Sequence, residues 1–122
     1  MAVDLAWRDA VRAACDPVFA SADVDFRWNG HSDFGVGSAP TLLWEADPLQ
    51  FAARYPDGRI EESYGEGWPA PCIDYWVYID PVSMTARLNV EGWGGPDPVV
   101  ELTGDGVVDG QLLAAAFAEI LR

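Results

Sequence analysis

Apolar residues at helical spacing mark the first segment of the chain. Trp7, Ala10, Val11 and Ala14 fall on one side of a helix expected over residues 3–15. Asp16-Pro17 predicts that this helix ends or kinks there, because proline disfavours helical geometry at the residue before it. The alternative is a further turn through residue 20, with the aspartate as its cap and the proline as its first residue.

Apolar positions at the other end of the chain predict a second long helix. We expect Asp109 to cap its N-terminus. Two adjacent rows at i+4 spacing should cover a sheet. The rows are Leu112, Ala116 and Ile120, and Leu113, Phe117 and Leu121.

Alternation of apolar and polar residues predicts the strands between these helices. The expected strands are residues 23–29, 41–46, 72–80, 85–91 and 99–103, with a less regular one at 59–64. A turn starting at Asp80-Pro81 should join 72–80 to 85–91 as an antiparallel hairpin. Asp47-Pro48 predicts a short helix between the second strand and residue 56, with Asp47 as its N-cap.

This order of elements predicts one α+β domain over residues 1–122. We expect a mostly antiparallel sheet of about five strands, with the N- and C-terminal helices packed on one face. The length of 122 residues suits a single domain, and the aromatic content suits a well-packed core. Four aromatic side chains are assigned to that core: Trp7, Phe26, Trp28 and Phe117.

Charge is the most unusual property of the composition. Twenty acidic residues face seven basic ones, all of them arginine, which gives a net charge of −13. Such a field repels nucleic-acid phosphates and anionic lipid and attracts basic partners, although net charge can also serve solubility alone. We expect no direct nucleic-acid binding and no membrane binding. The start of the chain lacks a secretory pattern and no apolar run could span a bilayer, so the expected location is the cytoplasm.

The residue types that carry most enzyme chemistry are scarce. His31 is the only histidine, and its neighbours Ser32 and Asp33 lie with it in a glycine-flanked loop. Adjacent residues in such a loop rarely meet the geometric requirements of a catalytic triad. Cys15 and Cys72 lie too far apart in sequence to suggest a zinc site, and we expect both to be reduced thiols. The glycine-containing loops lack the phosphate-binding patterns. The sequence therefore predicts no catalytic residue, metal or organic cofactor, and an enzyme is not the favoured interpretation.

Aromatic and acidic residues occur together in one part of the chain. Trp76 and Tyr78 share the second face of the strand over residues 72–80, between two aspartates. Tryptophan and tyrosine dominate binding hot spots, and surrounding charges steer association. The alternative is that both rings pack beneath residues 65–71 or a second layer. The predicted partner-binding residues are Asp57, Glu61, Glu62, Tyr64, Glu66, Trp68, Asp74, Trp76, Tyr78 and Asp80.

In size, charge and lack of catalytic groups, the chain resembles the small acidic immunity proteins that neutralise bacterial toxins. No motif carries this resemblance, so it assigns no residues. The expected function is a non-enzymatic acidic binding protein that engages a basic protein partner, of the immunity type. Two alternatives stay open: a small-ligand-binding domain or enzyme with a pocket lined by tryptophan and acids, and an acidic mimic of nucleic acid.

Overall fold

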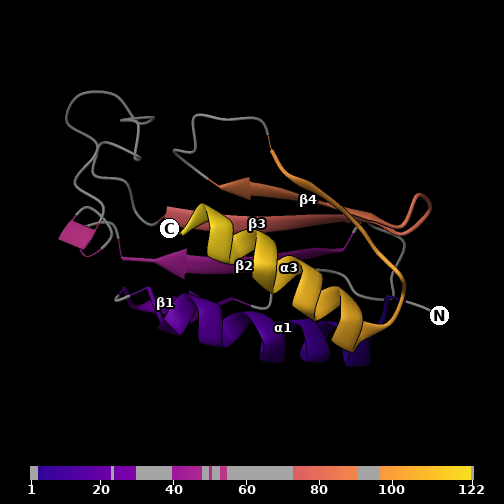
Figure 1. The fold of residues 1–122 in the computed structure, drawn as a ribbon, viewed down its shortest axis with the longest axis horizontal. Coiled ribbons are helices and arrows are strands. Elements are labelled where there is room, and N and C mark those ends of the chain that lie inside the picture. The colour runs from indigo at the N-terminus through magenta and orange to yellow at the C-terminus, as the bar shows by residue number, and fades with distance from the viewer. Residues whose placement is uncertain are drawn as a thin grey trace.

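The computed structural model describes residues 3–22, 24–29, 40–47, 50, 53–54, 73–90 and 97–121. Along the chain, one long helix precedes and another follows five strands, which form a single sheet (Figure 1). The elements are α1 Leu5–Ala20, β1 Phe26–Trp28, β2 Thr41–Ala46, β3 Ile73–Asp80, β4 Thr85–Val90, β5 Val99–Glu101 and α3 Gly106–Ile120.

The strands pair in sequence order, β1-β2-β3-β4-β5, and every neighbouring pair is antiparallel. The predicted α+β fold is confirmed, as is the hairpin between β3 and β4. The expected strand at 59–64 lies outside the described residues. The short helix after β2 is described only at residues 50 and 53–54, where Asp47 accepts a hydrogen bond from the backbone N–H of Gln50 at 3.1 Å, as an N-cap does.

Helix α1 starts at the N-cap Asp4, whose carboxylate accepts the backbone N–H of Trp7 at 2.9 Å. The helix does not end at Asp16 but continues through Pro17 to residue 20, as in the alternative with a further turn. An internal proline costs a helix one hydrogen bond. Here the last turn places Phe19 against the core, where it is 1% exposed, and this burial offsets the cost.

Helix α3 begins one turn earlier than predicted. Its N-cap is Asp105, which accepts the backbone N–H groups of Val107 and Val108 at 2.9 and 3.1 Å, so the prediction of Asp109 as the cap is wrong. Leu112 is 42% exposed, so the first predicted apolar row does not face the sheet as a whole. The buried side chains on the second half of the helix are Leu113, Phe117, Ile120 and Leu121.

The two helices approach each other unusually closely. A Cβ atom at Gly106 would lie 2.9 Å from the Cβ of Ala10, and one at Gly110 would lie 2.9 Å from the Cβ of Ala14. Real Cβ atoms do not approach that closely, so these two positions require glycine. The spacing of small residues, four apart on both helices, lets the backbones of α1 and α3 pack side by side.

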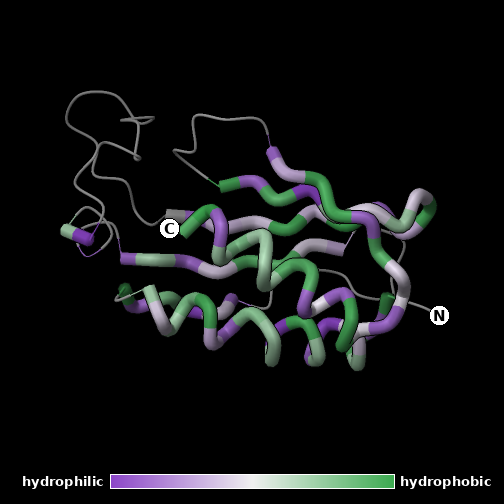
Figure 2. Tube along the Cα trace, viewed as in Figure 1, coloured by the Kyte–Doolittle hydropathy of each residue, from purple (hydrophilic) through white to green (hydrophobic). Residues whose placement is uncertain are grey.

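Both helices cover the same face of the sheet. Phe19 of α1 and Phe117 of α3 each contact Trp44 and Tyr75 of the central strands, with ring centroids 4.9–6.2 Å apart. Figure 2 shows hydrophobic and hydrophilic positions alternating along β4. Its apolar residues belong to the buried core. The core assignment is confirmed for Trp7 and Phe117, which are buried, whereas Phe26 and Trp28 are partly buried and pack against the core. No helix among the described residues is long and apolar enough to cross a membrane.

Cys15 provides a direct test of this packing. It is 0% exposed, and burial, together with the neighbouring charge of Asp16, raises the pKa of its thiol to about 12. The thiolate is the reactive form, so Cys15 should not react in the folded protein at pH 8. In a Cys72→Ser variant, thiol titration should detect no group in the native state and one after denaturation. Rapid modification of the native variant would contradict the burial, and a count below two in denatured, non-reduced wild type would contradict the prediction that both thiols are reduced.

Candidate binding surface

The face of the sheet opposite the helices carries the residues that the sequence analysis singled out. We call it the outer face. The strand register places its side chains in rows, because residues paired across antiparallel strands point to the same side. Its described residues are Arg27, Thr41, Leu43, Glu45, Asp74, Trp76, Tyr78, Asp80, Thr85, Arg87, Asn89, Val99 and Glu101. Within the described ranges, no helix or strand lies over this face.

Trp76 and Tyr78 form the aromatic centre of the outer face. Their rings stack, with centroids 5.7 Å apart and planes 19° from parallel. Both are partly buried, so the structure places them neither in the core nor fully in solvent. Leu43 is opposite Trp76 in the register and is 3% exposed, so a buried apolar side chain flanks the pair on the β2 side.

An arginine lies on the other side of the aromatic pair. Arg87 faces Tyr78 across the strands, with its guanidinium carbon 4.8 Å from the ring centroid. Its Nη1 also donates to Asp97 Oδ2 at 2.7 Å. Asn89 contacts the same carboxylate. These contacts hold the arginine flat on the sheet, so the Tyr78 ring is covered by a cation on the β4 side.

The two aspartates of β3 differ in their surroundings. Asp74 is partly buried, whereas Asp80 is exposed at the end of the strand. Asp80 Oδ1 accepts the backbone N–H of Val82 at 2.9 Å and that of Ser83 at 3.3 Å, and these hydrogen bonds lower the pKa of Asp80. Asp80 therefore stabilises the turn between β3 and β4. The same turn contains Met84 at a φ of 54°, in the left-handed region that favours glycine.

The outer face is acidic even after its ion pairs are counted. Arg27 pairs with Glu45 at 2.9 Å, and Arg87 pairs with Asp97. With Asp97 included, five carboxylates against two guanidinium groups leave an excess of three negative charges among the described residues. The other three carboxylates, which take part in neither of these two ion pairs, are Asp74, Asp80 and Glu101.

The other predicted partner-binding residues cannot be placed beside this face. Six lie outside the described residues: Asp57, Glu61, Glu62, Tyr64, Glu66 and Trp68. The same holds for His31 and Cys72. The structure therefore brings together Asp74, Trp76 and Tyr78, with Asp80 at the edge of the group.

The described residues offer little for metal or acid–base chemistry. Across these ranges, no three side chains of His, Cys, Asp or Glu gather as a metal site would require. Asp74 and Asp80 are about 20 Å apart along one strand at ~3.3 Å per residue, well beyond the separation of a glycosidase pair. The buried carboxylate of Asp109 is fully occupied by internal hydrogen bonds.

Sequence reasoning missed Arg87 and Asp97 as parts of this surface. The alternation of β4 already placed Arg87 on the polar side. Its position opposite Tyr78 follows only from the register, which the four-residue turn at 81–84 sets. Asp97 lies in a loop, where alternation carries no signal.

In comparisons with known proteins, no family model, no curated protein sequence and no solved structure matches the chain.

Proposed function

We propose that this protein is a non-enzymatic binding protein whose outer face engages a basic protein partner, in the manner of an immunity-type inhibitor. The observation that carries the proposal is the stacked, partly buried Trp76–Tyr78 pair on a sheet face with an excess of carboxylates. The opposite face is committed to the core, because α1 and α3 pack on it.

The chemistry of this face suits protein recognition. Large aromatic side chains supply most of the free energy at interfaces when they are desolvated, and charges at the rim steer the encounter. The whole chain adds to that steering, since its net charge is −13. A basic partner is therefore attracted at long range and held at short range by the aromatic pair.

The test is a quantitative pull-down from the source cell with three baits: wild type, Trp76→Ala and Val108→Ala. Val108 is 42% exposed on α3, so its truncation also removes exposed apolar surface but leaves the outer face intact. We expect a basic protein that wild type and Val108→Ala retain and Trp76→Ala loses. Thermal melts establish that each bait is folded, and Trp76→Phe, which keeps an aromatic ring, should bind with intermediate strength.

Kinetics on the captured partner then separate charge from contact. Association should slow as salt rises, because the Debye length falls from about 10 Å at 0.1 M to about 3 Å at 1 M. Trp76→Ala should raise the dissociation rate on the order of 30-fold, the equivalent of a hot-spot residue worth about 2 kcal/mol. An acidic partner, an association rate indifferent to salt, or equal retention by folded Trp76→Ala would each refute the proposal.

A further inference from the structure

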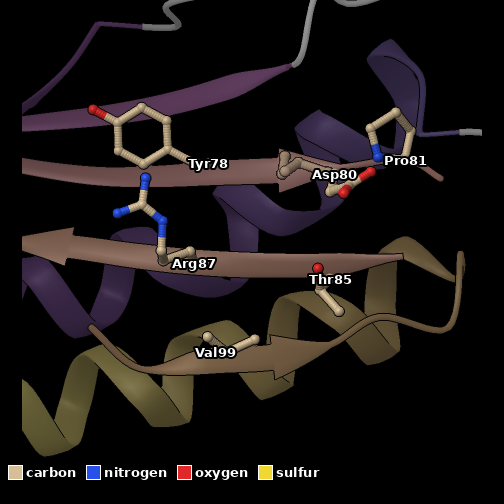
Figure 3. Close-up of a pocket in the computed structure, with 7 residues that line it drawn as sticks. Tyr78, Asp80, Pro81, Thr85, Arg87 and Val99 are labelled. Carbon is tan, nitrogen blue, oxygen red and sulfur yellow. The ribbon is translucent and has the colours of Figure 1, made fainter. Parts of the chain in front are cut away.

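β5 is an edge of the sheet, because β4 is the one described strand with which it pairs. Figure 3 shows β5 alongside β4, with the side chain of Val99 on it. The backbone N–H of Leu88 donates to the carbonyl of Pro98 at 2.9 Å. Past the other end of the strand, the N–H of Leu102 donates to the carbonyl of Met84 at 2.8 Å. The ladder with β4 therefore extends one residue beyond each end of β5.

The backbone groups on the far side of β5 have no described partner strand. In an antiparallel ladder, successive residues direct their N–H and C=O groups alternately towards one neighbour and away from it. Since Pro98 and Leu102 face β4, Val100 faces it too, and the groups of Val99 and Glu101 point outwards. Within the part of the chain that the structure describes, no hydrogen bond reaches those groups. Val99 is 63% exposed and Glu101 is also exposed, so this edge is accessible to another strand.

The opposite edge of the sheet is less accessible. Phe26 and Trp28 of β1 are partly buried and pack against the core. The guanidinium carbon of Arg12, on α1, lies 5.1 Å from the centroid of the Trp28 ring. Just before the strand, the backbone N–H of Asp25 donates to the side-chain oxygen of Gln50 at 2.9 Å. Side chains from other elements thus surround β1, whereas no described residue contacts the outward groups of β5.

Charge determines which strand suits the β5 edge. Charged side chains on an edge strand prevent pairing between identical copies. Arg87 is already paired with Asp97 at 2.7 Å, so the carboxylate of Glu101 leaves a negative charge beside the outward backbone groups. Two copies of this chain would bring these carboxylates together, and each copy carries a net charge of −13. The edge therefore disfavours a second copy and attracts a basic segment.

We propose that β5 receives an extended segment of the basic partner as an additional antiparallel strand. The segment exchanges two hydrogen bonds with Val99 and two with Glu101, which supply affinity independent of its side chains. Its residue opposite Val99 continues the outer-face row of Tyr78, Arg87 and Val99. A basic residue belongs opposite Glu101 and an apolar one opposite Val99, so the segment reads basic–any–apolar from its N-terminus. This inference deepens the proposed function and rests on it for the identity of the partner.

The test is a titration of the ¹⁵N-labelled protein at low salt with a peptide of this pattern, acetyl-Thr-Thr-Lys-Thr-Val-Thr-Thr-amide. New hydrogen bonds should move the amide protons of Val99 and Glu101 downfield and slow their exchange with solvent. The amide of Val100, which already faces β4, should shift much less. This alternation is specific to an added strand, because a peptide held by its side chains alone would not distinguish alternate backbone positions.

Matched peptides and variants separate backbone pairing from charge. A peptide with glutamate in place of lysine should bind roughly fivefold more weakly, and Glu101→Gln should weaken the lysine peptide about two- to fivefold. Val99→Pro removes an outward donor without removing a bond to β4, and it should abolish the shift at Glu101. Val99→Ala keeps the donor and is the control, since the alternating shifts should persist. Thermal melts establish that both variants are folded.

Three results would overturn the inference: no saturable shift, equal shifts at Val99, Val100 and Glu101, or unchanged binding by folded Val99→Pro. Shifts of the same amides with protein concentration, in the absence of peptide, would also overturn it, since the edge would then receive a second copy.

Failure of the proposed function is a separate result, seen when Val99→Pro is added to the baits. A basic partner that Trp76→Ala releases but Val99→Pro binds as wild type does would leave the proposed function standing and overturn the added strand. Peptide addition to β5 when no basic partner is captured would support the added strand and overturn the proposed function.

Discussion

Replacing Asp109 by alanine is expected to lower the free energy of unfolding by about 3–5 kcal/mol, because several donors lose a charged acceptor at once. The side chain is 0% exposed and lies between α1, α3 and the loop after β5. It accepts the indole N–H of Trp7 at 2.8 Å, the backbone N–H and the hydroxyl of Thr103, both at 2.8 Å, and the backbone N–H of Gly104 at 3.0 Å. Alanine would leave the Trp7 and Gly104 donors buried without a partner.

Asparagine is not a neutral replacement at this position. Each carboxylate oxygen of Asp109 accepts two hydrogen bonds, so the amide nitrogen of asparagine would face at least one N–H donor whichever way it is turned: that of Thr103 in one orientation, and those of Trp7 and Gly104 in the other. Asp109→Asn should therefore also destabilise the protein, whereas Asp9→Asn, on the exposed side of α1, should change the unfolding free energy by less than about 0.5 kcal/mol. Urea unfolding at pH 7 measures all three variants. A loss below about 1 kcal/mol for Asp109→Ala would show that the network does not stabilise the fold.

The pH dependence gives a second measurement on the same residue. Burial alone would raise the pKa of Asp109, but the hydrogen bonds from Thr103, Trp7 and Gly104 outweigh it and hold the pKa below its ordinary value. A lowered pKa means that the charged form stabilises the folded state above the unfolded-state pKa of about 3.9. The stability difference between wild type and Asp109→Ala should thus stay constant from pH 7 to about pH 5 and shrink below about pH 4. A difference that grows in acid would contradict this sign.

The same network shows why one helix start was misassigned. Asp105 and Asp109 both precede apolar runs, and aspartate is a good N-cap at either position. The choice is made by Trp7, which is 102 positions away in sequence and donates its indole N–H to Asp109. Local sequence patterns carry no information about a contact between residues so far apart in the chain. Pro17 is a similar case, because the burial of Phe19 against the core decides that α1 continues.

The strands were predictable for a physical reason. One face of the sheet is buried under the helices, so alternation in β3 and β4 indicates which side chains point inwards. β2 alternates less clearly, because Leu43 on the outer face is also buried. The predicted lengths of the two edge strands were less accurate. β1 and β5 each contain three paired residues, fewer than their alternation suggested, since alternation does not require a hydrogen-bonded neighbour.

The candidate site was predictable only in part. Alternation placed Trp76 and Tyr78 on one face, and this placement is confirmed. The covering of Tyr78 by Arg87 depends on how β3 and β4 are aligned, which composition and periodicity do not specify. The binding role of the face stays a prediction, which the pull-down and the binding kinetics described above test.

Replacing Phe117 by alanine should be comparably severe. The ring is 0% exposed and contacts Phe19, Trp44 and Tyr75 with centroids 4.9–6.2 Å away, so it joins both helices to the two central strands. Truncating a fully buried phenylalanine costs about 3–5 kcal/mol, from lost burial and from the cavity left among rigid rings. In a chain of this size, we expect the melting temperature to fall by about 10–20 °C.

Leu112→Ala is the matched control, since it shortens an apolar side chain on the same helix at a position that is 42% exposed. Leucine and alanine have similar helix propensities, so this change leaves the helix itself intact and should move the melting temperature by only a few degrees. Comparing the two variants therefore separates the loss of packing against the sheet from any effect on the formation of the helix. Equal, small shifts for both would mean that α3 does not seal the core through Phe117. Equal, large shifts would mean that its exposed row is packed as well, contrary to the orientation of the helix described above.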